Sequence, residues 1–339
     1  MMADERPAPT CLLVIPTLNE APHIGPLLDR MMVEARALGA RIVVADGGSS
    51  DGTQDIVRGK ARDDEGVSLI HNPRRIQSAA INLAVARCGA GIDYFIRIDA
   101  HGAYPDDYCS ALLAEAIATG ADSIAVPMIT TGQERLFQRA VAAAQNSLVG
   151  NGGSAHRTNA AGRWVEHGHH ALMRVAAFEA VGGYDEAFST NEDAELDFRL
   201  SAAGSRIWLS GRTRMVYYPR ASAASLFRQY FGYGGGRARN ILKHRVVPRL
   251  RQLVPLAVAP AVVLAGLSFL YWPALVPLML WLVASMALGA LTIARQAARY
   301  RLPTSSAPLV GAAAMIMHFA WSAGFWLELI SSMGRRRSS

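Results

Sequence analysis

The stretch CLLVIPTLNEAPHIGPLLDRMMVEARALGARIVVADGGSSDGT, residues 11–53, decides the fold of this chain. It holds two apolar runs of strand length, CLLVI and RIVVA, separated by an amphipathic stretch that is long enough for a helix. Further short apolar runs follow at residues 67–70, 93–98 and 123–126. Such alternation of strand and helix patterns predicts an α/β domain with a mainly parallel sheet.

Polar clusters come directly after three of these predicted strands. They lie at residues 17–20, 46–53 and 99–101. Because ligands of parallel sheets bind beyond the carboxyl ends of the strands, we expect the three loops to converge on one site. Pro16 cannot continue a ladder of hydrogen bonds and is expected to end the first strand. The polar side chains that follow it are able to hold a base and a ribose: Thr17, Asn19 and Glu20.

The second loop, DGGSSDGT, has glycines that let a ligand approach the backbone closely. Asp46 at its start is placed to accept a hydrogen bond from an imide N–H of a base. The alternative is a tight turn in which Ser50 or Asp51 caps the following helix by accepting from its free amides. Both functions are compatible with one loop.

Asp99 and His101 follow the predicted strand at residues 93–98 at alternate positions, so their side chains are expected on the same side. A carboxylate and an imidazole suit Mn²⁺ or Mg²⁺ that bridges phosphate oxygens. Such an ion stabilises a departing nucleoside diphosphate by neutralising its charge. An ordinary polar loop is the alternative interpretation.

The run NEDAELDFR, residues 191–199, predicts the start of a helix, where the helix dipole favours a carboxylate. A carboxylate here is able to deprotonate an acceptor hydroxyl, although a solvated helix start is the simpler alternative. The Gly-rich and His-rich stretch before it, residues 151–170, ends in His167-Gly168-His169-His170. We expect these histidines to border an acceptor pocket, because they lack the carboxylate or thiolate ligands of a second metal site.

Charge and hydropathy divide the chain. The 339 residues carry 34 Lys and Arg against 27 Asp and Glu, a net charge of +7, and the excess flanks apolar segments. We therefore expect anionic lipid headgroups, and no nucleic acid, as the partner of the basic residues. The apolar segments approach the roughly 20 residues that cross a bilayer and lie at residues 253–270, 273–293 and 308–330.

The predicted organisation has three parts: a catalytic domain at residues 1–222, an amphipathic interfacial linker at 223–252, and a membrane domain at 253–339 with two or three transmembrane helices. The glycines at 234–236 predict a broken interfacial helix, or else a surface helix with a flexible loop. Three crossings would place the arginines at 335–337 outside, against the positive-inside tendency, so either this tendency fails here or one segment does not cross. His318 and Glu328 lie in the last segment and are expected in a polar interior or near its ends.

The amino terminus, MMADERPAPT, carries acidic residues and no apolar run, which argues against a signal peptide or a membrane span there. The first domain is therefore expected in the cytoplasm, at the inner membrane. Cys11, Cys88 and Cys109 lack CxxC spacing and fit reduced structural thiols.

Taken together, PTLNE, DGGSSDGT, RIDAH and GGYDEAFSTNEDAELDFRL resemble glycosyltransferase family 2 in their order and spacing. They resemble more closely its succinoglycan-biosynthesis glucosyltransferase branch, the ExoA type, as does NPRRIQSAAINLA before the RIDAH strand. The resemblance spans residues 12–199 and implies a GT-A fold, an inverting single displacement and a divalent metal. His101 stands where the broad family usually has a second aspartate, although the narrower branch is similar here.

The resemblance also implies roles for single residues. Asp193, in the NEDAE motif, is the expected general base, and Asp99 and His101 are the expected metal ligands. The expected donor-binding residues are Pro16, Thr17, Asn19, Glu20, Asp46, Asp51, Arg75, Gln77 and Asp99.

These features predict a membrane-anchored glycosyltransferase that moves a sugar from a nucleotide-sugar, a UDP-sugar, to a hydroxyl of a lipid-linked glycan in exopolysaccharide synthesis. Its expected partners are the nucleotide-sugar donor, the lipid-linked saccharide acceptor and membrane lipids. Two alternatives stay open: a polyprenyl-phosphate sugar synthase, and a membrane transport or scaffold protein with a nucleotide-sensing domain. A dinucleotide-dependent oxidoreductase is disfavoured because no GxGxxG follows the first strand.

Overall fold

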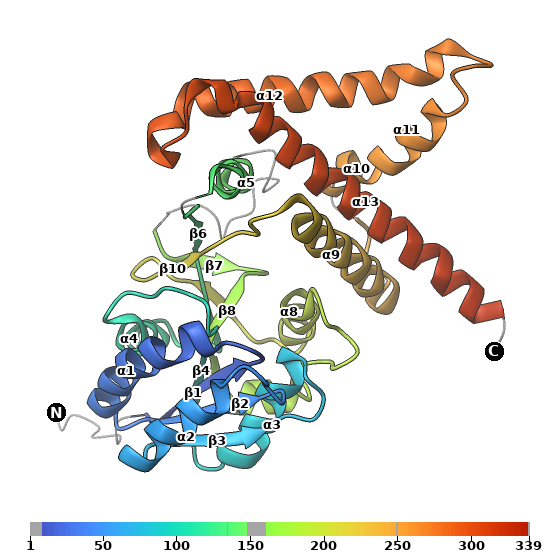
Figure 1. Ribbon diagram of the computed structural model, residues 1–339. Helices are drawn as coiled ribbons and strands as arrows, with labels where there is room; N and C mark the ends of the chain where they lie inside the picture. Colours follow the sequence, from blue (N-terminus) through green and yellow to red (C-terminus); the bar gives the residue numbers. More distant parts are fainter. Residues whose placement is uncertain (1–8, 134, 148–160, 249, 338–339) are drawn as a thin grey trace. The chain divides into compact units, whose positions relative to one another are not determined.

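The computed structural model describes residues 9–133, 135–147, 161–248 and 250–337 (Figure 1). The chain divides into two compact units, and neither is continuous in sequence. The first unit comprises Met1–Met128 with Thr158–Met215, and the second comprises Ile129–Arg157 with Val216–Ser339. These borders differ from the predicted division at residues 222 and 252, whose assignment to catalytic, interfacial and membrane functions stays a prediction. The predictions for residues 1–8 and 151–160 lie outside the described residues.

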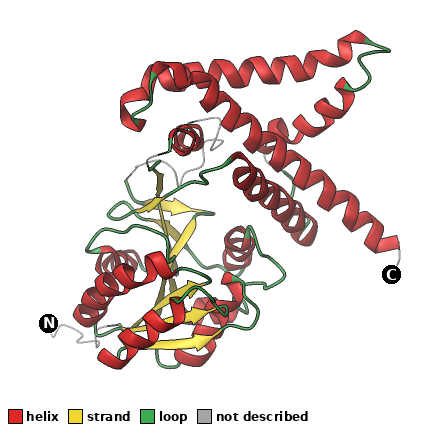
Figure 2. Ribbon diagram, in the orientation of Figure 1, coloured by secondary structure: helices red, strands yellow, loops and turns green. Residues whose placement is uncertain are grey.

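The first unit is built on an eight-stranded sheet with the order β3-β2-β1-β4-β8-β5-β9-β7 (Figure 2). Neighbours among β1 to β4 run parallel, as do β5 and β9, whereas β8 and β7 run antiparallel to their neighbours. The predicted mainly parallel sheet is thus confirmed, with all five predicted strands in it. The strands are β1 Cys11–Thr17, β2 Arg41–Asp46, β3 Val67–His71, β4 Tyr94–Arg97, β5 Ser123–Val126, β7 Arg163–Val165, β8 His169–Arg174 and β9 Ile207–Leu209.

Strand β1 does not end at Pro16, as the sequence predicted, but continues to Thr17. Its pairing with β4 stops at Val14, whereas its pairing with β2 continues through Pro16 and Thr17. The missing N–H of Pro16 is tolerated because β1 has a ladder on one side only at this level.

Helices cover both faces of this sheet, and the alternation of side chains along β1 decides which core each residue joins. Leu13 and Ile15 pack into the core beneath α1, α2 and α4, which also buries Cys11 and Cys109. Leu12 and Val14 pack into the opposite core, beneath α3, α7 and α8. The helices are α1 Ala21–Leu38, α2 Thr53–Asp63, α3 Gln77–Cys88, α4 Tyr108–Thr119, α7 Val175–Ala180 and α8 Glu192–Ala202.

Strand β8 contains a bulge that changes which face its residues present. Its register with β5 shifts between Ile124 and Ala125, so that Ile124 lies opposite Leu172 and Ala125 opposite His170. Ala171 is therefore an extra residue, and consistent with this, Ala171 and Leu172 both join the α1 side core. A bulge of this kind reverses the alternation for the residues that precede it.

The second unit is mostly helical. Its helices are α5 Leu136–Asn146, α9 Ala223–His244, α10 Leu250–Leu256, α11 Val258–Ala265, α12 Val276–Tyr300 and α13 Ala307–Arg337, with the 3₁₀ turns η2 Trp272–Leu275 and η3 Thr304–Ser306. Two short strands, β6 Met128–Thr130 and β10 Met215–Tyr217, form a separate two-stranded sheet.

Helix α9 is continuous, so the predicted break or flexible loop at the glycines 234–236 is wrong. These glycines instead allow α9 and α13 to pack with their backbones close together. A Cβ added to Gly234 would lie 1.9 Å from the carbonyl oxygen of Trp321, and one added to Gly324 would lie 2.0 Å from that of Phe231. Glycine lowers helix propensity, but here it permits a contact that no other residue fits. Glu328 on α13 lies 3.9 Å from Arg239 on α9, which gives this acidic residue a cationic neighbour.

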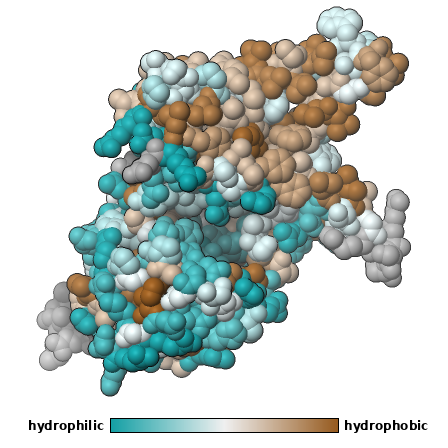
Figure 3. Space-filling model, in the orientation of Figure 1, coloured by the Kyte–Doolittle hydropathy of each residue, from teal (hydrophilic) through white to brown (hydrophobic). Residues whose placement is uncertain are grey.

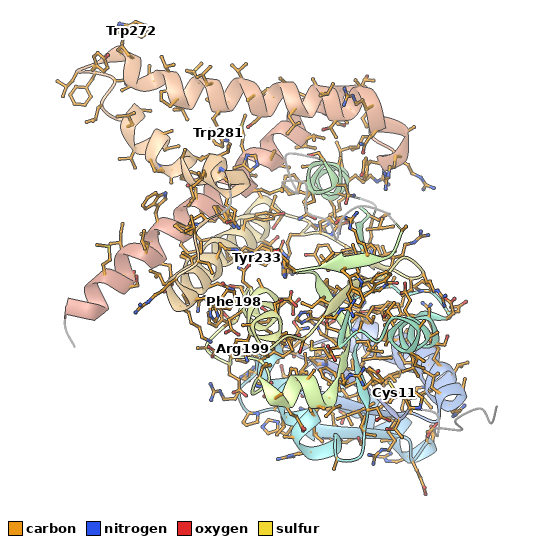
Figure 4. All side chains as sticks on the ribbon, turned by 180° about the vertical axis from the view of Figure 1, so that it is seen from behind. Cys11, Phe198, Arg199, Tyr233, Trp272 and Trp281 are labelled. Atoms are coloured by element: carbon orange, nitrogen blue, oxygen red, sulfur yellow. The ribbon has the colours of Figure 1, made fainter. Side chains whose placement is uncertain are left out.

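Two helical segments in the described residues are long and apolar enough to cross a membrane, Trp272–Tyr300 and Thr304–Gly334. The predicted segment at residues 253–270 is not one helix: Pro255 lies inside α10, and α11 has only eight residues. Apolar side chains lie exposed along α11 and α12 (Figure 3). Trp272 lies at the turn before α12, where it is 73% exposed (Figure 4).

Candidate active site

The loops after β1 and β2 meet at the carboxyl edge of the sheet, as predicted. Thr17 lies opposite Asp46 in the ladder and donates a hydrogen bond of 2.9 Å from its hydroxyl to Asp46 Oδ2. Asp46 also accepts from the backbone N–H of Gly48 and from both the N–H and the hydroxyl of Ser49, at 2.5 to 2.9 Å. Burial raises the pKa of Asp46, but these donors outweigh burial and hold the pKa below its ordinary value. Asp46 therefore organises the loop, and an imide N–H of a ligand would compete with donors already present.

Hydrogen bonds join the two loops further along the chain. Asn19, in the left-handed conformation with φ 58°, accepts from Ser50 N–H through its side chain and donates its own N–H to the Ser49 hydroxyl. Asp51 accepts from the N–H of Thr53 at the start of α2 and from the N–H of Ala21 at the start of α1. Hydrogen bonds from Thr53 and Ala21 lower the pKa of Asp51. Asp51 thus satisfies a free amide at the start of each of the two helices, as the capping alternative expected, although the N-cap residues themselves are Glu20 and Gly52.

The third loop brings Asp99 and His101 to the same edge. Asp99 Oδ1 accepts from Gln77 Nε2 at 2.6 Å and from Arg97 Nε at 3.0 Å. His101 is half exposed, and its Nδ1 lies 3.0 Å from Glu20 Oε1, which links the third loop to the first. The predicted residues Gln77, Glu20, Asp99 and His101 are therefore brought together.

Arg97 is a buried cation between two carboxylates, and the sequence analysis did not select it. Its guanidinium lies 3.0 Å from Asp99 Oδ1 and 2.8 Å from Asp193 Oδ1, and its side chain is 5% exposed. Burial lowers its pKa, but Asp193 and Asp99 raise it by more, so Arg97 stays charged. An arginine inside an otherwise apolar strand was the signal for this role, because a buried charge requires partners.

Helix α8 positions Asp193 in its first turn, as predicted. Asn191 before the helix adopts φ 60°, a conformation that asparagine tolerates better than most residues. Besides Arg97, Asp193 Oδ1 accepts from the Tyr184 hydroxyl at 3.1 Å. Burial raises the pKa of Asp193, but Arg97 and two histidines hold it well below the ordinary value. Burial and the adjacent Asp193 raise the pKa of Glu192 to about 7.

A buried imidazole, His170, and a buried carboxylate, Asp197, lie next to Asp193 and Tyr184. His170 is fully buried, and its Nε2 lies 2.5 Å from Asp197 Oδ1 while its Nδ1 lies 2.8 Å from the Tyr184 hydroxyl. His167 Nδ1 lies 2.6 Å from Asp197 Oδ2. Burial lowers the pKa of His170, but Asp197 and Asp193 raise it by more. We refer to Arg97, Asp99, Asp193, His170 and Asp197 as the Arg97 cluster.

Gly168 allows the histidine run to approach the sheet. A Cβ at this position would lie 2.3 Å from the Ala125 side chain, and the Gly168 N–H donates to Asp197 Oδ2 at 3.2 Å. The Ala171 bulge then places His170 on the α8 side of the sheet, where it meets Asp197. The sequence placed these histidines beside an acceptor pocket but gave no signal for their bonds to Asp197.

Pro16 and Arg75, two of the predicted donor-binding residues, are located at the site through their backbones. Pro16 lies in the ladder opposite Ala45. Arg75 is exposed, with φ 58°, and its backbone passes close to Gly47, where an added Cβ would lie 3.3 Å from Arg75 Cα. The structure thus places Arg75 beside the second loop.

The donor set fits a divalent cation with few protein ligands. Within the described parts of the chain, no three His, Cys, Asp or Glu side chains are grouped to hold a metal ion by themselves. Mg²⁺ in nucleotide sites is usually held by one or two carboxylates together with substrate phosphates, so such a group is not required. Asp99 Oδ2, which has weaker contacts than Oδ1, and the half-exposed His101 are suitable ligands of this kind.

Comparison with known proteins gives matches along most of the chain. A family model described as Glycosyl transferase family 2 matches residues 12–182. The chain is 57% identical over 330 residues to succinoglycan biosynthesis protein ExoA of Rhizobium meliloti (strain 1021), covering 97% of this chain and 98% of that protein. It is 24% identical over 246 residues to a dolichyl N-acetyl-alpha-D-glucosaminyl phosphate 3-beta-D-2,3-diacetamido-2,3-dideoxy-beta-D-glucuronosyltransferase of Methanococcus voltae, covering 68% of this chain and 74% of that protein.

Among solved structures, the mannosyltransferase PcManGT from Pyrobaculum calidifontis, in complex with GDP-Man and Mn²⁺, is similar in fold. The TM-score is 0.52 with 21% sequence identity, and the match covers 93% of this chain and 88% of that chain.

Proposed function

This chain belongs to glycosyl transferase family 2, and we propose that it catalyses an inverting transfer from a nucleotide-sugar to a hydroxyl of a lipid-linked glycan in exopolysaccharide synthesis. The predicted family, its ExoA branch and the GT-A fold are confirmed, and the chain is a glycosyltransferase. One observation carries the proposal for the reaction: Arg97 holds Asp99 of the donor side and Asp193 of α8 at the same edge of the sheet.

The proposed reaction is a single displacement. The acceptor oxygen bonds to the anomeric carbon on the face opposite the nucleotide, and the bond from that carbon to the diphosphate oxygen breaks. The proton of the acceptor hydroxyl passes to a carboxylate oxygen of Asp193. Because the attacking hydroxyl becomes much more acidic as its oxygen bonds to carbon, a carboxylate with a low pKa suffices as the base. The low pKa of Asp193 keeps this base ionised at neutral pH.

The proposed donor side consists of the three joined loops. Thr17, Asn19, Glu20, Asp46 and Asp51 make a preformed surface whose hydrogen bonds fix the backbone before a nucleotide arrives. Preorganisation lowers the entropic cost of binding. Gln77 supports Asp99 directly, and Arg75 is placed to add positive charge near the phosphates.

A divalent ion, Mn²⁺ or Mg²⁺, would be held by Asp99 and His101 together with the phosphates of the donor. When bound, it neutralises the charge that develops on the leaving diphosphate. Arg97 keeps Asp99 ionised, since burial alone would raise the pKa of this carboxyl.

We propose further that α12 and α13 are two membrane crossings and that the catalytic domain is cytoplasmic. An even number of crossings returns the arginines at 335–337 to the cytoplasmic side, in agreement with the positive-inside tendency. The apolar helical stretch Gln252–Ala265, which includes α11, spans only about 21 Å, short of the roughly 30 Å hydrocarbon core. The proposed partners are therefore anionic membrane lipids and a lipid-linked acceptor.

The test uses the full chain in nanodiscs against a panel of UDP-sugars and GDP-sugars, with and without Mn²⁺ or Mg²⁺. We expect one nucleotide class to raise the melting temperature in a metal-dependent way, and its sugar to be transferred to a lipid-linked glycan with inverted anomeric configuration by NMR. Transfer to a bare polyprenyl phosphate would favour the synthase alternative, and retained configuration would refute the single displacement. If no nucleotide raised the melting temperature, the transport or scaffold alternative would be favoured.

A further inference from the structure

His169 lies between the two carboxylates to which the proposed reaction assigns different roles. Its Nε2 is 3.6 Å from Asp99 Oδ2, and its Nδ1 is 3.6 Å from Asp193 Oδ2. The three side chains come from three separate places in the sequence, the loop after β4, the start of β8 and the first turn of α8. One imidazole therefore faces the donor side with one nitrogen and the base side with the other.

Both contacts are longer than a hydrogen bond, for which nitrogen and oxygen lie about 2.7–3.2 Å apart. The neighbouring His170 differs in this respect, because its two ring nitrogens lie 2.5 Å and 2.8 Å from oxygen partners. The His169 side chain is also 14% exposed, whereas that of His170 is fully buried. His170 is thus held by two short contacts, whereas His169 interacts with Asp99 and Asp193 only at 3.6 Å, distances that a closer ligand oxygen can replace.

The position of His169 indicates which part of a ligand it would meet. In the proposed displacement, the leaving diphosphate lies on the Asp99 side and the attacking oxygen lies next to Asp193. The transferred sugar must occupy the space between these two, because its anomeric carbon bonds to one oxygen as it leaves the other. A side chain that contacts both carboxylates therefore borders the space of the transferred sugar.

We propose that His169 hydrogen-bonds a hydroxyl group of the transferred sugar and so contributes to donor selection, an inference that rests on the proposed function. The partner is the sugar of a nucleoside-diphosphate sugar, and the proposed binding surface of the nucleotide is formed by other residues, those of the loops after β1 and β2. His169 is in this respect a substrate-contacting residue, whereas His170 and Asp197 position Asp193 from behind.

The test compares a nucleotide-sugar with its nucleotide in the full chain, using UDP-glucose and UDP, or GDP-mannose and GDP where the panel selects that class. For His169→Gln, calorimetry is expected to show about tenfold weaker binding of the nucleotide-sugar, the loss of one hydrogen bond, with binding of the nucleotide alone changed by less than about twofold. His23→Gln, an exposed histidine on α1, is the matched control and is expected to leave both affinities unchanged.

A second measurement keeps the proposal testable if His169→Gln folds poorly. In the wild-type protein, one deoxy analogue of the donor sugar should bind about tenfold more weakly than the parent, and in His169→Asn that difference should disappear, because the two changes remove one shared interaction. Equal losses for nucleotide and nucleotide-sugar, or additive losses with every deoxy analogue, would overturn the proposal. Failure of the wild-type protein to bind any nucleotide-sugar would instead contradict the proposed function.

Discussion

Two regions at one edge of the sheet hold their carboxylates by different means. In the loops after β1 and β2, Asp46 and Asp51 accept hydrogen bonds from backbone amides and hydroxyl groups. In the Arg97 cluster, carboxylates are compensated by a buried guanidinium and by imidazoles. In the first region each carboxylate accepts several hydrogen bonds from neutral groups, whereas in the second Asp99 and Asp193 share one buried guanidinium. We therefore expect single substitutions to be much more damaging in the Arg97 cluster.

The largest effect is expected for Asp193→Asn. The amide keeps the size of the side chain but accepts no proton, so kcat should fall by about 10² to 10⁴. Steady-state transfer assays measure kcat, and calorimetry should show donor affinity within about threefold of wild type. Transfer at close to the wild-type rate would remove Asp193 from the role of base.

Replacement of Arg97 by methionine tests the buried cation. It leaves Asp99 and Asp193 buried without their shared cation, and removing one partner of such a pair typically costs about 3–5 kcal/mol. Urea unfolding of the purified protein measures the change in the free energy of unfolding. Arg58→Met is the control, because Arg58 pairs with Asp55 at the surface and its loss should cost less than about 1 kcal/mol. Similar costs for both variants would contradict the comparison.

Asp46→Ala tests the hydrogen-bonded region. It removes the acceptor for Thr17, Gly48 and Ser49, and we expect a loss of about 1–3 kcal/mol in the free energy of unfolding. Asp46→Asn should cost less, because one oxygen acceptor remains. The comparison fails if Asp46→Ala destabilises the protein as much as Arg97→Met does.

The smallest effect concerns pH. Because the pKa of Glu192 is raised to about 7 in the native state, native Glu192 binds its proton more tightly than the unfolded chain does between about pH 4.5 and 7. This residue therefore contributes stability at low pH that is lost as pH rises through that window. Glu192→Gln should raise stability at pH 7.5 relative to pH 4.5 by on the order of 1–2 kcal/mol compared with wild type. Urea unfolding at the two pH values checks the slope, and parallel pH profiles would show that Glu192 titrates normally.

The sequence predicted the hydrogen-bonded region better than the Arg97 cluster. PTLNE and DGGSSDGT are contiguous motifs, and the partners of Asp46 within its own loop lie two or three residues away. Arg97, His170 and Asp193 are up to 96 residues apart and meet only through the order of β4, β8 and α8 in the fold. Periodicity and motif spacing carry no information on such contacts, so Arg97, Tyr184 and Asp197 were not selected from the sequence.

Helix breaks were predicted less well than strands. The glycines at 234–236 indicated a break by propensity, but tertiary packing against α13 overrode that propensity. Mean apolarity indicated a long helix at residues 253–270, where Pro255 and a series of turns divide the segment. Local composition decided neither case.

The extra residue at Ala171 decides which face of the sheet the preceding residues of β8 present, through the register of the strand and not through side-chain chemistry. If the same residues formed a regular ladder with no bulge at Ala171, Leu172 and Met173 would keep their cores, while His170 would turn from α8 toward the opposite face. Every side chain type would still be present, and the strand would still pair with β4 and β5. The face that the imidazole presents to Asp197 is therefore set by the register of the strand, and a relative that lacked the extra residue would be expected to keep this contact in a regular strand without a bulge.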